Sequence, residues 1–177
     1  LRNKALLRIS KIIHEDWKDD VIVTTGSSTE LGISSNSIDY IFVDPPFGGN
    51  LNYSELSFIW EAWLKVITNN KDEAIMNKSQ DKGLLEYQNL MMGCFSEFFR
   101  VLKPGRWMTV EFHNSKNAVW NAIQEALSRT GFVVADVRTL DKKQQSFKQI
   151  NSNGAVKQDL VISAYKPRDE FKEKIKM

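Results

Sequence analysis

Residues 38–50 read IDYIFVDPPFGGN, and this stretch decides the fold. A nearly continuous apolar run ends at the carboxylate of Asp44, and two prolines, a phenylalanine and two glycines follow at once. The run predicts a strand that is buried on both faces, as strands inside parallel sheets are. Because proline has no N–H to give to a sheet, the strand must end at Asp44. We therefore expect Asp44 at the carboxyl edge of a sheet, where open α/β folds bind their ligands.

The composition of residues 1–177 indicates a single globular domain. The chain is 42% hydrophobic and 26% charged, with a formal net charge of +2, which is ordinary for a soluble protein of this length. A charge this small is compatible with nucleic-acid binding but does not argue for it. The single cysteine excludes a disulfide framework, and no apolar run is long enough to span a membrane. We expect a cytoplasmic protein.

Helical and strand patterns alternate on both sides of the opening stretch. Helices are predicted over residues 1–18, 53–67, 82–102 and 116–129, and further strands over residues 21–25, 106–113, 132–140 and 160–165. The apolar stripes of the two central helices, which include Trp60, Trp63, Phe95, Phe98 and Phe99, are interpreted as core packing. Alternation of this kind predicts an α/β fold with a mostly parallel sheet and an antiparallel pair of strands at its end. The charged residues 168–177 are expected to fray.

Residues 44–47, DPPF, resemble the catalytic motif of the DNA amino-methyltransferases. These enzymes transfer a methyl group from S-adenosylmethionine to the exocyclic amine of adenine or cytosine. The form with aspartate first and an aromatic residue last resembles the adenine-specific members. Weaker similarity continues through residues 53–56, 60–64, 102–105 and 131–132, although only the DPPF stretch is specific. The resemblance implies a class I methyltransferase sheet of Rossmann type, S-adenosylmethionine as cofactor, DNA as substrate and a place in a restriction-modification system.

The sequence departs from that family at one point. Class I methyltransferases carry a glycine-rich loop of the form Phe-x-Gly-x-Gly after their first strand, and no such motif occurs here. The resemblance therefore implies the catalytic half of a methyltransferase, with a partner segment or chain that carries the glycine loop. A homodimer is a second way to cover an exposed sheet edge.

The resemblance also assigns roles within residues 44–47. The exocyclic amine of adenine is a poor nucleophile, because its lone pair is delocalised into the ring. The Asp44 carboxylate and the Pro45 carbonyl would accept its hydrogens and direct the lone pair at the methyl group. Pro46 would wall the pocket, and Phe47 would stack on a base that has been flipped out of the duplex.

Further residues are candidates with a structural alternative beside each. Gly26 and Ser27 would contact the cofactor together with Asp44, or they form a simple turn. Residues near the DPPF motif would line the surface that faces DNA, or they form a glycine hinge and a helix start: Gly48, Gly49, Asn50 and Tyr53. His113 and Asn114 would line the pocket at the end of the next strand, although Asn114 is also a natural helix cap. With two histidines in the chain, no metal site is expected.

Two other functions stay open on the sequence alone. Some RNA amine methyltransferases share an Asp-Pro-Pro-aromatic motif, so the substrate could be RNA. The chain could also be a non-catalytic nucleic-acid-binding or assembly module derived from a methyltransferase.

Overall fold

The computed structural model describes residues 21–24, 26–49, 51–114, 116–140 and 159–168. The predicted helix over residues 1–18, the polar segment 141–158 and the tail from residue 169 lie outside these ranges. The described elements are β1 (Ile38–Val43), α2 (Tyr53–Leu64), the short 3-10 helix η2 (Lys78–Gln80), α3 (Leu84–Val101), β2 (Leu102–Phe112), α4 (Asn117–Arg129), β3 (Val133–Leu140) and β4 (Asp159–Tyr165).

The four strands form one mixed sheet in the order β1-β2-β4-β3. β1 pairs with β2 in parallel, and β4 pairs antiparallel with both β2 and β3. This confirms the predicted α/β class and the antiparallel pairing of the last two strands. Within the described residues the sheet is mixed rather than mostly parallel.

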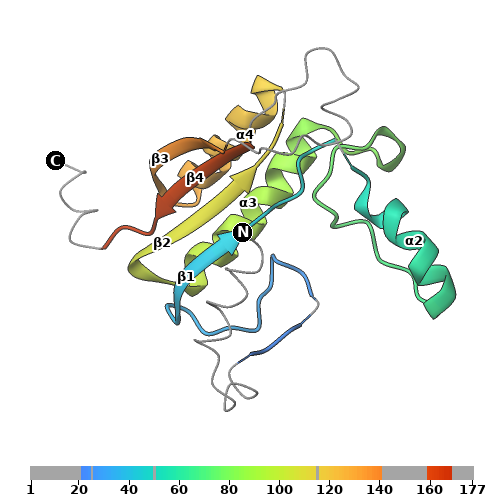
Figure 1. Cartoon of the computed structure of the whole chain (residues 1–177), viewed down its shortest axis with the longest axis horizontal. Helices are drawn as coiled ribbons and strands as arrows, with labels where there is room; N and C mark the ends of the chain where they lie inside the picture. The colour runs from blue at the N-terminus through green and yellow to red at the C-terminus, as the bar shows by residue number, and fades with distance from the viewer. Residues whose placement is uncertain (1–20, 25, 50, 115, 141–158, 169–177) are drawn as a thin grey trace, which may run out of the picture.

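The helices α3 and α4 lie on the same face of the sheet (Figure 1). Between them and the sheet lies a single core, whose largest buried side chains include Tyr87, Phe95, Phe112, Ile123 and Leu127. The alternation of β2 explains its contribution, because Met108, Val110 and Phe112 point inward at every second position. Gly131, directly after the C-cap of α4, has a φ of +95° and begins the turn into β3.

The prediction that β1 is buried on both faces is wrong. Ile41 and Val43 pack against the core, but Tyr40 and Phe42 are 55% and 58% exposed. The reason is that α3 and α4 cover only one face of the sheet (Figure 1). An apolar run predicts a strand, but it does not tell which of its faces a neighbour covers.

β2 starts four residues earlier than predicted and includes Pro104 and Gly105. The register with β1 jumps at this point, from the pair Ile38 and Leu102 to the pair Tyr40 and Trp107. Pro104 cannot donate to the ladder and Gly105 has a φ of +76°, so the chain bulges out before regular pairing resumes.

Two further predictions fail at the described N-terminal end and at α2. The strand pattern over residues 21–25 does not form a strand in its described part, because residues 21–24 have no regular structure and are exposed. The predicted core stripe of α2 is also exposed, with Trp60 at 73% and Trp63 at 84%, and no residue of α2 is buried. Figure 1 shows why, since α2 projects away from the sheet and its covering helices. The stripe of α3 is correctly predicted, because Phe95 and Phe98 are buried and Phe99 packs beside them.

Candidate active site at the carboxyl edge of the sheet

The DPPF loop lies where the sequence predicts it. It begins directly after β1, and the parallel neighbour β2 ends two residues beyond the partner of Val43, which is Val110. Asp44 therefore lies at the same edge of the sheet as His113 and Asn114. The Asp44 side chain is exposed, whereas Pro45, Pro46 and Phe47 are partly buried.

The backbone of this loop is bound by side chains from two other elements. The Tyr87 hydroxyl, on α3, donates to the Pro46 carbonyl over 2.7 Å. The Asn114 amide, just after β2, donates to the Phe47 carbonyl, also over 2.7 Å. Tyr87 is fully buried and Asn114 is 5% exposed. Hydrogen bonds in such a dry environment hold the loop in one position before any ligand arrives.

Asn114 has two structural roles, and neither is the helix cap that the sequence suggests. Its side-chain oxygen accepts from the Lys116 N–H over 2.7 Å, which closes the turn before α4. The helix cap itself is Lys116, so Asn114 acts just before the position that a helix-cap residue occupies. Its side-chain nitrogen donates to the Phe47 carbonyl, so one buried amide connects the end of β2, the turn before α4 and the DPPF loop.

The Phe47 ring is held by two aromatic neighbours. The Phe112 ring lies 5.6 Å away at 83°, and the His113 ring lies 6.0 Å away at 64°. Both are edge-to-face arrangements of the kind that aromatic rings prefer. The end of β2 thus fixes the orientation of the ring that the sequence predicts will stack on a base.

Gly48 and Gly49 have a steric reason to be glycines. Gly48 has a φ of +73°, and a Cβ there would lie 3.4 Å from both Asn114 and Val119. A Cβ on Gly49 would come within 3.2 Å of the Met76 carbonyl oxygen. The pair lets the chain pass close to the segment around Met76, whose N–H donates to the Gly48 carbonyl. This supports the predicted hinge, while Asn50 lies outside the described residues.

Tyr53 lies close to the Asp44 loop. Burial raises the pKa of its hydroxyl, and the charge of Asp44 acts in the same direction, whereas the backbone of Phe47 acts against it. The start of α2 is held in place by Glu73, which accepts from the Ser54 N–H over 2.9 Å and from the Ser54 hydroxyl over 2.7 Å. Tyr53 is thus brought next to the loop, as the sequence suggests.

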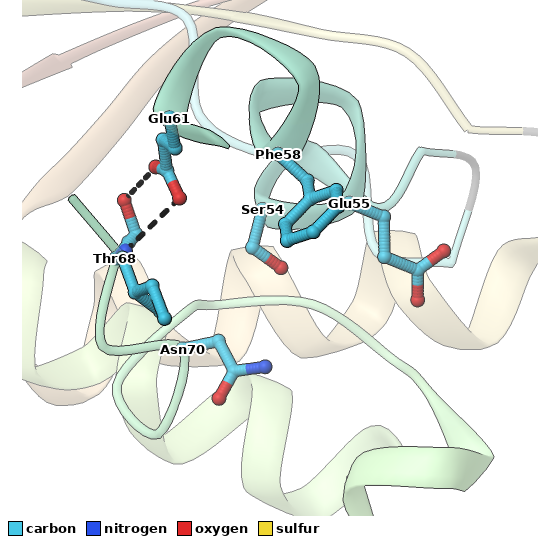
Figure 2. A pocket seen from close by; sticks show the side chains of 7 residues that line it. Ser54, Glu55, Phe58, Glu61, Thr68 and Asn70 are labelled. Carbon is cyan, nitrogen blue, oxygen red and sulfur yellow. Dashed lines mark hydrogen bonds between the residues drawn. The ribbon is translucent and has the colours of Figure 1, made fainter. Parts of the chain in front are cut away.

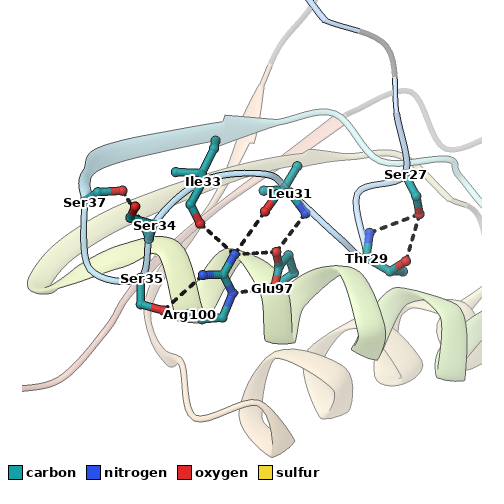
Figure 3. Close-up of polar contacts among 9 residues, drawn as sticks. All are labelled: Ser27, Thr29, Leu31, Ile33, Ser34, Ser35, Ser37, Glu97 and Arg100. Carbon is teal, nitrogen blue, oxygen red and sulfur yellow. Dashed lines mark hydrogen bonds and ion pairs between the residues drawn. The ribbon is translucent and has the colours of Figure 1, made fainter.

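Ser27 is placed elsewhere, on the side of α3. Its hydroxyl lies 2.7 Å from that of Thr29, and Thr29 lies against Gly93 in the middle of α3. The segment is held there by Arg100 and Glu97 (Figure 3). Arg100 donates to the Leu31 and Ile33 carbonyls, and Glu97 accepts from the Leu31 N–H. The local bonds of Ser27 to Thr29 fit the turn alternative.

A cavity of about 270 Å³ lies apart from this edge, between α2 and residues 67–70 (Figure 2). Two carboxylates line it, those of Glu55 and Glu61, and Glu61 is bonded to the Thr68 backbone and hydroxyl. Negative charge without a basic side chain suits neither a phosphate nor a nucleic acid. We assign the cavity no part in the chemistry.

The described ranges contain no cluster of histidine, cysteine and carboxylate side chains that could hold a metal ion. None of their helices has the length and hydrophobicity that crossing a bilayer requires.

Sequence reasoning missed Tyr87, Asp159 and both structural roles of Asn114. Tyr87 reads as one more member of the apolar stripe of α3. Asp159 lies opposite His113 where the antiparallel strands β2 and β4 meet, next to the pair Phe112 and Leu160. The strand pattern predicts an antiparallel pair, but only a register shows that these two residues face each other.

Comparison with known proteins gives one family and several distant structures. A family model described as DNA methylase matches residues 38–177. No curated protein sequence matches significantly. A candidate DNA modification methylase from Thermus thermophilus is 14% identical, with a TM-score of 0.48 over 84% of this chain and 56% of that one. Its complex with S-adenosylmethionine gives 16% identity and a TM-score of 0.46, over 84% of this chain and 59% of that one.

An S-adenosylmethionine-dependent methyltransferase from Methanosarcina mazei is 12% identical, with a TM-score of 0.47 over 81% of this chain and 66% of that one. The chain thus spans less than two thirds of the length of these structures. With TM-scores below 0.5, the match of the family model is the finding that places the chain.

Proposed function

The chain belongs to the DNA methylase family, and we propose that the full-length protein transfers a methyl group from S-adenosylmethionine to the exocyclic amine of an adenine in DNA. The observation that carries this proposal is the DPPF loop, in which an exposed carboxylate stands on a backbone that Tyr87 and Asn114 hold in place. Such preorganisation is what a reaction that depends on positioning requires.

The residues at this edge fit the reactive end of the cofactor. Asp44 is exposed, and within the described sheet β1 is an edge strand. S-adenosylmethionine, when bound there, supplies a methyl group activated by a sulfonium sulfur. We propose that the rest of the cofactor is held by a glycine-rich loop in another segment or chain, because this sequence contains none.

The family resemblance suggests the acceptors for the amine hydrogens. The carbonyls of Pro46 and Phe47 accept hydrogen bonds from Tyr87 and Asn114, which hold the loop in place. We propose that the Pro45 carbonyl and the Asp44 carboxylate accept the two amine hydrogens. They would draw the nitrogen toward a pyramidal geometry and stabilise the positive charge that develops on it.

Phe47 would supply the flat surface for the base. An amine inside a duplex cannot reach a site at a sheet edge, so the nucleotide must be flipped out, at a cost of a few kcal/mol. Stacking on an aromatic ring returns about 1–3 kcal/mol per base. Phe112 and His113 restrain the orientation of the Phe47 ring through T-shaped contacts, and we propose that one face of this ring is presented to the base.

Mass spectrometry of nucleosides tests the proposal. The full-length protein is incubated with S-adenosylmethionine that carries a deuterated methyl group, together with unmethylated duplex DNA or tRNA. We expect deuterated N6-methyladenine from DNA. A label found only in tRNA would identify an RNA enzyme, and a label on cytosine N4 would assign the other base. If neither nucleic acid is labelled and calorimetry detects no cofactor binding, the enzymatic proposal is overturned.

A further inference from the structure

A buried acid-imidazole pair lies beside the Phe47 ring. The His113 Nδ1 atom is 2.6 Å from an Asp159 side-chain oxygen. The side chains are 20% and 7% exposed, respectively. His113 follows the last residue of β2, and Asp159 is the first residue of β4, so the antiparallel ladder itself brings the two together.

The distance between Nδ1 and the Asp159 oxygen bears on which imidazole nitrogen carries the proton. Two atoms that both present lone pairs repel each other at 2.6 Å, whereas a protonated nitrogen and a carboxylate attract. The contact favours a proton on Nδ1, although its angles fall short of a hydrogen bond, and Nε2 is the nitrogen farther from Asp159. A carboxylate that selects the tautomer and the orientation of an imidazole is a familiar way to prepare a histidine for a defined role.

The imidazole in turn packs against Phe47. The two rings are 6.0 Å apart at an angle of 64°. Phe112 packs on the same ring at 5.6 Å, and Trp120 supports Phe112 at 5.1 Å and 90°. Asn114 holds the Phe47 backbone. Three consecutive residues, 112–114, thus restrain Phe47, and among them only His113 has its orientation set by a buried charge.

The stability of the fold alone does not explain an acid beside an imidazole at the end of β2. Well-packed apolar residues of similar size often stabilise a fold as well as a buried ion pair does. A pair of this kind can instead specify one orientation. The orientation at stake here is that of the ring on which the base would lie.

We propose that Asp159 and His113 are positioning residues of the methyl-transfer site. The Asp159 carboxylate orients the imidazole, and the imidazole restrains the plane of the Phe47 ring, which determines where the base lies beside Asp44. The kinetic part of this inference rests on the proposed function, whereas the placement of the two rings does not.

The test compares Asp159→Asn and Asp159→Ala in the full-length protein. The asparagine oxygen can still accept from Nδ1–H, whereas alanine offers no acceptor. We expect Asp159→Ala to lower kcat on the order of 10-fold or more, because small misplacements at a reacting centre cost this much. Asp159→Asn should restore most of the rate, and the KM for S-adenosylmethionine should stay constant in both. Asp136→Ala is the matched control, since Asp136 lies on β3 and pairs with the exposed Arg138.

A spectroscopic readout separates this inference from the proposed function. In ¹⁵N spectra of selectively labelled full-length protein, the imidazole signals of His113 are identified as those missing from a His113→Gln variant. We expect the proton on Nδ1 in the parent and in Asp159→Asn, and a shift toward Nε2 in Asp159→Ala. Contacts between the ring protons of His113 and Phe47 should weaken only in the alanine variant.

The outcomes are distinct. A proton on Nε2 in the parent, or ring contacts unchanged in a folded Asp159→Ala, would overturn the inference even if methyl transfer is observed. A kcat that is unchanged in Asp159→Ala would do the same. If the parent transfers no methyl group but shows the expected tautomer and ring contacts, the proposed function fails while the placement of Phe47 by the pair is supported.

Discussion

At the scale of single residues, the site depends on side chains that connect elements rather than on the motif alone. Asn114 joins the DPPF loop to the turn before α4, and Tyr87 joins the same loop to α3. Glu97 and Arg100 do similar work on the other flank of α3, where they hold residues 31–35 (Figure 3). In each case a polar side chain binds backbone groups of an irregular segment, because such a segment has no helix or strand partner for them.

The Glu97 carboxylate predicts an acid-dependent loss of stability. Its hydrogen bond with Arg100 lowers its pKa from 4.5 to about 2. A carboxylate with a lowered folded-state pKa stabilises the protein at pH values above the unfolded pKa, and loses that contribution as the pH falls toward the folded value. The free energy of unfolding should therefore fall between about pH 4.5 and pH 2, and less steeply in Glu97→Gln.

Urea titrations at several pH values check this prediction. Glu125→Gln is the matched control, because Glu125 also pairs with an arginine on its own helix but is 48% exposed. We expect this change on α4 to alter stability by no more than about 0.5 kcal/mol. An identical pH slope in the parent and in Glu97→Gln would contradict the assignment.

At the scale of elements, the difference between α2 and α3 shows what an apolar stripe indicates. Both helices carry large apolar side chains at helical spacing, yet Phe95 is buried and Trp63 is 84% exposed. The stripe predicts the helix in both cases. Whether a helix is covered depends on the direction in which its loops place it, and the glycine hinge after Phe47 leads α2 away from the sheet (Figure 1). Tyr40 and Phe42 on β1 show the same limit for a strand.

Lys166 stabilises the opposite edge of the sheet, just after β4. Its buried ammonium donates to the Asn36 side chain and to the Phe99 carbonyl over 2.6 Å, and to the Leu102 carbonyl over 2.9 Å. It thereby satisfies carbonyls at the end of α3, where the helix dipole favours a positive charge.

Lys166→Met should lower the free energy of unfolding by about 1–3 kcal/mol, because it leaves buried oxygens without a donor. Urea unfolding measures the change. Lys103→Met is the control, since Lys103 forms an exposed pair with Asp39, for which we expect a loss of at most about 1 kcal/mol. Equal stabilities for the two variants would refute the role given to Lys166.

At the scale of the whole molecule, one edge of the sheet carries the residues of the proposed chemistry, and Lys166 stabilises the opposite edge. Asp44, Phe47, His113 and Asn114 gather at the carboxyl ends of β1 and β2, as the parallel pairing requires. The face of the sheet away from α3 and α4 exposes aromatic side chains in the described structure. The chain spans less than two thirds of the solved structures it matches, so the complete cofactor site remains a proposal.

Features that depend on local chemistry could be predicted from the sequence, whereas contacts between distant residues could not. The end of β1 at Asp44, the glycine turn at Gly131 and the antiparallel final strands follow from local chemistry, namely missing N–H groups, positive φ angles and strand patterns. The anchors Tyr87, Asn114 and Asp159 could not be found in this way, because each acts on a residue that is distant in the sequence. Their partners are set by packing, which a single sequence does not display.

The central claim is that the Asp44 carboxylate, on its anchored loop, accepts the hydrogens of the target amine. The most direct test is the methyl-transfer rate of Asp44→Ala in the full-length protein, measured on DNA with a labelled methyl donor. Asp39→Ala is the matched control, because Asp39 lies on the same strand but pairs with Lys103 and Arg106 at its far end. We predict that Asp44→Ala lowers kcat by about 100-fold or more with unchanged thermal stability, while Asp39→Ala keeps a rate close to that of the parent. A folded Asp44→Ala variant that transfers methyl groups at the parent rate would contradict the account.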